Sequence, residues 1–88
     1  MTGTYRVIIP KSVRKAVEAL GPGLQARIVA RLDALSENPR PRGAVKLAGQ
    51  PGTFRLRVGT WRIVYQVFDA ELVVLLIKVA HRREVYRS

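Results

Sequence analysis

Arginines alternate with apolar residues in the first part of the stretch from Phe54 to Phe68, F-R-L-R-V-G-T-W-R-I-V-Y-Q-V-F. Successive side chains of a strand point to opposite faces, so Arg55 and Arg57 share one face and the intervening apolar residues share the other. A glycine-threonine pair then connects this strand to a second, antiparallel one. If the apolar residues of that second strand join the core, Arg62 lies on the face of the first two arginines.

Three guanidinium groups on one patch repel each other, which favours a polyanionic partner that neutralises them. Cations of this kind can also support RNA cleavage without a metal. Attack of a 2′-OH on its adjacent phosphate needs only charge stabilisation of the pentacoordinate transition state and an in-line attacking oxygen. The residues with that capacity are Arg55, Arg57, Arg62, Arg82 and Tyr86, the last as a positioning or base-stacking group. Composition alone leaves simple RNA binding open.

The charge balance also favours a nucleic acid or an acidic protein as partner. The 88 residues include 16 Lys and Arg but only 6 Asp and Glu, for a net charge of +10. Arginine outnumbers lysine by twelve to four, which favours bidentate phosphate recognition. Between Asn38 and Phe68 there are six basic residues and no carboxylate, a window more typical of a binding surface than of a solvated one.

Most other active sites are excluded by residue type. The chain has no cysteine and one histidine, His81, so it cannot build a thiolate site or a multi-histidine metal centre. It has no glycine-rich phosphate loop, and we expect no cofactor. The N-terminus lacks the pattern of a signal peptide, and the longest apolar run is too short to span a bilayer. We therefore expect a cytoplasmic protein without a membrane role.

The elements around the arginine hairpin follow from periodicity. A β-branched run over 4–9 ends at a proline, and apolar spacing of three and four residues then predicts two helices joined by a tight turn. The predicted segments are a strand at 4–9, helices at 11–20 and 24–38, a short strand at most at 44–48, the hairpin, and a strand at 72–80.

This order predicts an α+β fold, β-α-α-β-β-β, in one domain over 1–88. We expect a small antiparallel or mixed sheet with the N-terminal helix hairpin packed on one face. The opposite face, which carries the arginines, is then left uncovered. The helical arginines, including Arg27 and Arg31, are assigned no specific role.

Four segments in this order resemble the RelE/ParE superfamily of bacterial toxin–antitoxin toxins. They are L-x-x-N-P at 35–39, K-L-x-G at 46–49, F-R-L-R-V-G-T-W-R-I-V-Y-Q-V from residue 54, and V-A-H-R-R-E-V-Y from residue 79. The resemblance covers nearly the whole chain and is closest to the RelE-like branch. It implies a RelE-like fold and an mRNA interferase that cleaves mRNA in the ribosomal A site through a 2′,3′-cyclic phosphate, without metal.

The resemblance also implies roles for individual residues. The two basic positions of the family's hairpin strand fall on Arg55 and Arg57, and the next phosphate-binding arginine falls on Arg62. The basic residue proposed to protonate the leaving group falls on Arg82, and the terminal aromatic falls on Tyr86. These are the positions that strand parity and residue chemistry single out independently.

One departure from the family concerns the general base. The best-known members carry lysines in the first strand of this hairpin, one of them a proposed base, whereas this chain has arginines. A guanidinium, with a pKa above about 12, hardly ever loses its proton, so Arg57 is a poor base. Tyr86 is a conceivable substitute, as is His81, although strand parity places His81 opposite to Arg82. We expect Arg55 and Arg57 to stabilise the transition state and cleavage to be weaker or differently driven.

Additional phosphate contacts are predicted for Lys46, Lys78 and Arg83, with a solvated surface as the equal alternative for each. The expected partners are a RelB-like antitoxin, the bacterial ribosome and mRNA, in a toxin–antitoxin hetero-oligomer. Two other functions stay open. One is a ParE-like DNA gyrase inhibitor without nuclease activity, and the other is a catalytically weak RNA-binding module.

Overall fold

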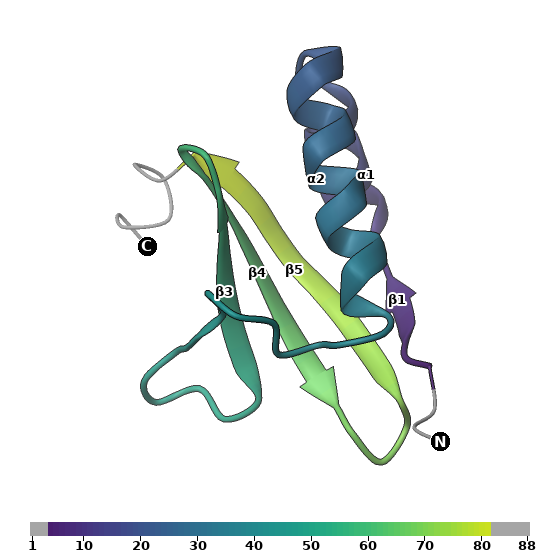
Figure 1. Ribbon diagram of the computed structural model, residues 1–88, viewed down its shortest axis with the longest axis vertical. Coiled ribbons are helices and arrows are strands. Elements are labelled where there is room, and N and C mark those ends of the chain that lie inside the picture. The colour runs from purple at the N-terminus through teal and green to yellow at the C-terminus, as the bar shows by residue number, and fades with distance from the viewer. Residues whose placement is uncertain (1–3, 82–88) are drawn as a thin grey trace.

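The computed structural model describes residues 4–81 as two helices and a five-stranded mixed sheet (Figure 1). The elements are β1 (Arg6–Ile8), α1 (Lys11–Glu18), α2 (Pro22–Leu35), β2 (Val45–Lys46), β3 (Thr53–Val58), β4 (Trp61–Phe68) and β5 (Val73–His81). The predicted α+β class and element order are confirmed, and β2 is the short strand expected within 44–48.

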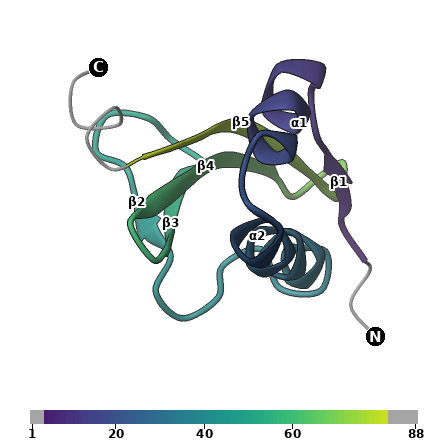
Figure 2. The ribbon, with the colours of Figure 1, turned by 90° about the horizontal axis from the view of Figure 1, so that it is seen from above.

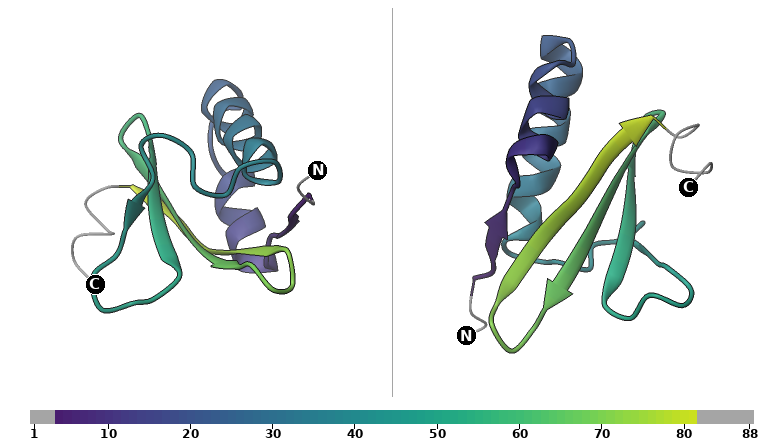
Figure 3. Two further views of the ribbon diagram at one scale, coloured as in Figure 1. Left: turned by 60° about the horizontal axis from the view of Figure 1, so that its bottom comes forward. Right: turned by 180° about the vertical axis from the view of Figure 1, so that it is seen from behind.

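The strands lie side by side in the order β1-β5-β4-β3-β2. β1 pairs in parallel with β5, and the other neighbours are antiparallel. Because β1 pairs only with residues 73–75, α1 takes its place along the second half of β5, where Ser12, Val13 and Ala16 line a small hollow with 77–79. Figure 3 shows β1 beside the first half of β5, with α1 continuing from it.

Both helices are shorter at their C-terminal ends than the sequence predicts. α1 ends at Glu18, two residues before the predicted end, and α2 ends at Leu35. α2 begins at Pro22, because a proline at the first helical position has no amide hydrogen to lose. After Leu35 the chain turns, and the Asn38 side chain accepts a hydrogen bond of 3.1 Å from the Arg40 amide, an arrangement typical of asparagine turns.

The hydrophobic core lies between α2 and one face of the sheet, with α1 closing one side (Figure 2). α2 contributes Ile28, Leu32 and Leu35, which recur at helical spacing and are nearly or fully buried. The sheet contributes the side chains of one face, and their parity along β5 changes at a register shift opposite Val64 and Tyr65. Ala80 is also buried, but it lies on the other face, opposite Arg62. The buried apolar residues of the sheet are Leu56, Val58, Ile63, Tyr65, Val67, Val74, Leu76, Val79 and Ala80.

Residues 36–44 join α2 to β2, and we call this segment the connector. Tyr65 attaches the connector to the core. Its ring is fully buried, stacks on Phe54 with ring centroids 5.9 Å apart, and its hydroxyl donates a 2.8 Å hydrogen bond to the Pro39 carbonyl oxygen. Burial raises the pKa of the Tyr65 hydroxyl to about 12, because the phenolate loses its water. The connector is therefore fixed over the sheet at its first proline.

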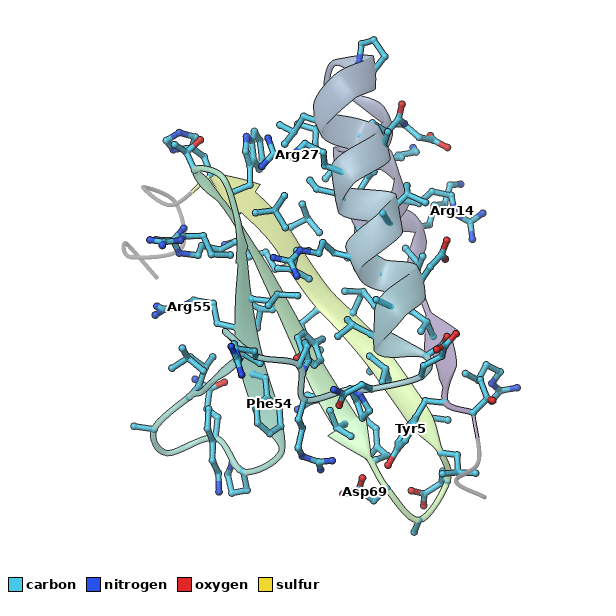
Figure 4. The ribbon with its side chains drawn as sticks, in the orientation of Figure 1. Tyr5, Arg14, Arg27, Phe54, Arg55 and Asp69 are labelled. Atoms are coloured by element: carbon cyan, nitrogen blue, oxygen red, sulfur yellow. The ribbon has the colours of Figure 1, made fainter. Side chains whose placement is uncertain are left out.

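A second fastening, the polar clamp, consists of Tyr5, Arg40 and Asp69. Arg40 donates two hydrogen bonds, 2.6 and 3.1 Å, to the Asp69 carboxylate, and the Tyr5 hydroxyl donates a third of 2.5 Å. The Arg40 guanidinium also lies 5.5 Å from the centre of the Phe54 ring. The clamp joins the start of the chain, the connector and the β4–β5 turn at one end of the molecule, where Figure 4 shows Tyr5 and Asp69 together.

Among residues 4–81, no helix is long and apolar enough to cross a membrane.

Candidate nucleic-acid interface

The β3–β4 hairpin places its three arginines on one face, as strand parity predicts. Arg57 is directly opposite Arg62, and Arg55 is opposite Val64. Directly opposed residues of antiparallel strands project from the same face. Figure 4 shows Arg55 pointing away from the side of β3 that faces α2. Arg55, Arg57 and Arg62 are therefore neighbours, and the pairing of β3 with β4 sets their spacing.

The hairpin connection is a two-residue turn, because Val58 pairs with Trp61. Gly59 has a φ of +60°, which the first central residue of a type II′ turn requires and which other residues rarely adopt. α2 reaches this turn through Arg27, whose guanidinium nitrogens lie 3.8 and 3.9 Å from where a β-carbon of Gly59 would be. This tight turn fixes the register that opposes the arginines.

The predicted lysine contacts divide between the two faces. Lys78 of β5 is opposite Val64, so it lies on the arginine face and is exposed, in the same row as Arg55. Lys46 of β2 is opposite Phe54, which faces the core side of the sheet. Lys46 is thus separated by the sheet from the three arginines.

His81 lies away from the arginine face, as parity predicts. It is opposite Trp61 in β4, and the two rings meet edge to face with centroids 5.7 Å apart. The row that carries Arg62 continues in β5 with Ala80, not with His81. The geometry of the described residues therefore places the imidazole on the indole side of the sheet.

The sequence predicts that all three hairpin arginines are uncovered, and this prediction is wrong for Arg62. Arg62 is only 5% exposed, whereas Arg57 is exposed and Arg55 is half-buried. Nη1 of Arg62 makes a long hydrogen bond of 3.5 Å to the Trp61 carbonyl oxygen. A buried guanidinium holds its position better than a solvated one, because fewer rotamers are open to it.

The three hairpin arginines line a pocket of about 410 Å³ that we call the arginine pocket. α2 contributes one further arginine and the connector another. The full lining is Arg31, Arg42, Gly43, Val45, Arg55, Leu56, Arg57 and Arg62. Five of these eight described residues are arginines and none is a carboxylate, so the pocket has the charge and donors for an anion.

Sequence reasoning missed Arg31 and Arg42 as members of this cluster. Arg31 lies 24 positions before Arg55 in the sequence, on an exposed part of α2. Only the packing of α2 over the sheet brings it to the pocket. A weak signal was present, since the residues three and four positions from Arg31 along the helix include no carboxylate.

Arg82, Arg83 and Tyr86, the three predicted site residues at the end of the chain, lie outside the described residues.

Comparison with known proteins identifies the family. The model of the ParE toxin of type II toxin–antitoxin systems, parDE, matches residues 7–86. The chain belongs to the RelE/ParE superfamily of toxins. It is 31% identical over 84 residues to the toxin RelG of Mycobacterium tuberculosis, an alignment that covers 94% of this chain and 97% of RelG.

Two further superfamily members are similar to this chain. The mRNA interferase toxin RelE of Escherichia coli is 38% identical over 71 residues, covering 76% of this chain and 74% of RelE. The structure of the RelE–RelB complex from Pyrococcus horikoshii superimposes with a TM-score of 0.81 at 33% identity, covering 90% of this chain and 96% of the other. These similarities confirm the RelE-like fold predicted from the sequence.

Proposed function

We propose that this RelE/ParE toxin is a ribosome-dependent mRNA interferase. The observation that carries the proposal is the gathering of five arginines around one pocket without a carboxylate among the described lining residues. Each arginine in such a cluster is repelled by the others, and a phosphodiester relieves that repulsion while accepting paired hydrogen bonds. The similarity to a relative named an mRNA interferase supports the same conclusion.

The reaction is an intramolecular phosphoryl transfer within the RNA. The 2′-oxygen forms a bond to phosphorus, the bond from phosphorus to the 5′-oxygen of the next nucleotide breaks, and the products are a 2′,3′-cyclic phosphate and a 5′-OH. The 2′-OH proton passes to a base, and the leaving oxygen gains a proton from an acid. Extra negative charge develops on the phosphoryl oxygens, so preorganised cations lower the barrier most there.

Individual residues take the following parts in this proposal. Arg57 and Arg62, directly opposed on the hairpin, hold the phosphoryl oxygens with help from Arg55. Arg82 protonates the leaving oxygen, because a departing alkoxide is a stronger base than a neutral guanidine and can take a proton that the group otherwise keeps. Tyr86 orients the attacking nucleotide. The general base stays open between Tyr86 and His81, and the position of His81 on the opposite side of the sheet from the arginines favours Tyr86.

Peripheral cations serve other stretches of RNA. Lys78 lies on the arginine face and can extend the phosphate contacts across β5. Lys46 lies on the opposite face, so any contact that it makes is to a different segment, such as ribosomal RNA. Arg83 is assigned to phosphate binding at the end of the chain.

The proposed partners are an antitoxin, the ribosome and mRNA, which places the protein in the cytoplasm. The superimposed P. horikoshii protein is a RelE in complex with RelB, and we propose that a RelB-like antitoxin forms a hetero-oligomer with this chain. An acidic or amphipathic antitoxin segment that covers the arginine pocket would keep the toxin inactive.

Purified protein added to bacterial ribosomes stalled on a defined mRNA with an empty A site tests the function. We expect primer extension to reveal new 5′ ends inside the A-site codon, and these ends to disappear in Arg82→Ala and Tyr86→Ala. The exposed Arg14 of α1 lies on the far side of the molecule (Figure 4). Arg14→Gln should therefore cleave as the wild type does.

The same preparation is tested against DNA gyrase, because the matching family model is that of ParE. If the mRNA stays intact and DNA supercoiling is blocked, the proposed interferase function is wrong and the protein is a ParE-like gyrase inhibitor. Inactivity in both assays would leave an RNA-binding module. In a cleaving protein, Arg57→Lys should raise the rate if the missing lysine base limits it, and an unchanged or lower rate would contradict that explanation.

A further inference from the structure

Arg31 and Arg42 extend the arginine pocket beyond the hairpin. Arg31 is on α2 and Arg42 is on the connector, and both side chains are exposed, whereas the hairpin contributes the half-buried Arg55 and the buried Arg62. The pocket therefore has two sets of guanidinium groups supplied by separate parts of the fold. A single phosphate can accept bidentate bonds from only a few guanidiniums, and five exceed its capacity.

Within residues 4–81, no carboxylate binds Arg42, in contrast to its neighbour in the connector. Two residues earlier, Arg40 binds Asp69 through two hydrogen bonds. Arg42 lines the pocket instead, together with Gly43, where the absence of a side chain leaves the backbone accessible. Arg31 likewise has no carboxylate three or four positions away on its helix.

The size and walls of the pocket fit a nucleotide chain. Its volume of about 410 Å³ lies within the range of small-ligand sites, roughly 300–1,000 Å³. Val45 and Leu56 supply the apolar part of the lining. Guanidinium planes bind phosphates and also stack on unpaired bases, so this lining suits single-stranded RNA.

We infer that Arg31 and Arg42 bind a second phosphate of the RNA strand, next to the phosphate held by Arg55, Arg57 and Arg62. The arginine pocket thus holds two consecutive phosphates, one at the reacting centre and one beside it. This inference rests on the proposed function for the first phosphate. It assigns to Arg31 and Arg42 a positioning part, because they hold the strand and do not touch the scissile bond.

A chemical double-mutant cycle tests the second phosphate. Short single-stranded RNAs carry one neutral methylphosphonate at successive positions and a 2′-O-methyl group at the scissile nucleotide, which prevents cleavage. Their binding is measured with three proteins: the wild type, the double variant Arg31→Gln/Arg42→Gln, and a control. The exposed pair Arg14→Gln/Lys15→Gln on α1 removes the same charge outside the pocket and serves as the control.

Wild-type protein and the control should lose affinity, by about tenfold, at two neighbouring methylphosphonate positions. The Arg31→Gln/Arg42→Gln protein should respond at only one of them. Its plot of log affinity against log salt should also be shallower by about 0.7, the value for one phosphate of a single strand. Its thermal midpoint should match that of the wild type, because both side chains are exposed.

Two results would overturn the inference. One is the same two-position response in the Arg31→Gln/Arg42→Gln protein as in the control. The other is unchanged RNA binding with weakened binding of poly-L-glutamate, which would assign the outer arginines to an acidic protein segment. Neither depends on cleavage, so an absence of A-site cleavage by the wild type contradicts the proposed function alone.

Discussion

Arg40 and Arg42 stand two residues apart in the same proline-rich connector, and the fold uses them in opposite ways. Arg40 is held within the molecule by the carboxylate of Asp69, which also binds Tyr5, and by the aromatic ring of Phe54. Arg42 joins four other arginines around a pocket whose described lining has no carboxylate. Charge count alone therefore does not separate arginines held inside the fold from arginines that line an open pocket. The partners of each guanidinium do.

The pKa shifts in the polar clamp agree with this division. Hydrogen bonds from Arg40 and then from Tyr5 lower the pKa of the Asp69 carboxyl group. The hydrogen bond to Asp69 raises the pKa of the Tyr5 hydroxyl. The clamp therefore stabilises the ionised Asp69 carboxylate, the protonated Arg40 guanidinium and the neutral Tyr5 hydroxyl. Its contribution to folding depends on pH for that reason. The lining of the arginine pocket, in the part of the chain that the structure describes, includes no carboxylate.

The largest effect should come from the pocket. Arg57→Gln removes an exposed guanidinium that directly opposes Arg62, and we expect the rate of A-site cleavage to fall by about a hundredfold or more. The thermal midpoint should hold or rise slightly, because a like-charge contact is relieved. Single-turnover primer extension and thermal melting measure the two quantities. A cleavage rate within a few-fold of the wild type would remove Arg57 from the reacting centre.

Tyr65→Phe should give the largest loss of stability among the connector contacts. It removes the hydroxyl that binds the Pro39 carbonyl oxygen, and a buried acceptor without its donor costs about 1–3 kcal/mol. The free energy of unfolding from urea titration measures this cost. An unchanged value would show that the hydrogen bond contributes nothing to folding.

The same variant has a characteristic alkaline response. The folded-state pKa of Tyr65 is raised to about 12 from an unfolded value near 10. Its stabilising contribution is therefore complete below about pH 10 and is lost as the pH rises through about 12. Tyr65→Phe should flatten the fall in stability over that range, with the part due to Tyr5 remaining. An identical alkaline fall in both proteins would contradict the assignment.

Asp69→Asn should have a smaller effect, because the clamp is exposed to solvent. The folded-state pKa of Asp69 is lowered, so its contribution is present above the unfolded value near 4 and is lost as the pH falls below it. We expect a lower thermal midpoint than the wild type at pH 7 and convergence of the two midpoints at more acid pH. Glu71→Gln in the same turn is the control. A difference that does not shrink as the pH falls would point to a cause other than the ion pair.

Periodicity was sufficient for the fold and for the hairpin part of the site. The alternation around Arg55 and Arg57 predicted their shared face, and the position of the glycine turn brought Arg62 to it. The same logic placed His81 away from that face. These predictions depend only on strand pairing, which the apolar pattern specifies strongly.

The remaining features depend on tertiary packing that no local pattern contains. Arg31 and Arg42 reach the pocket because α2 packs over the sheet and the connector leads from α2 to β2. The burial of Arg62 and the side of the sheet taken by Lys46 likewise follow from the assembled fold. A two-residue strand such as β2 carries too little alternation to fix its parity in advance.

The most direct test compares Arg40→Gln with Arg42→Gln, two substitutions that remove the same charge from the same connector. At about 0.15 M salt, where exposed charges act over roughly 8 Å, single-stranded RNA affinity and thermal midpoint are measured for each. We predict that Arg42→Gln weakens RNA binding at an unchanged midpoint, and that Arg40→Gln lowers the midpoint while the folded protein keeps its RNA affinity. Equal loss of RNA affinity in both variants would show that net charge alone governs binding, and would contradict the division between clamp and pocket.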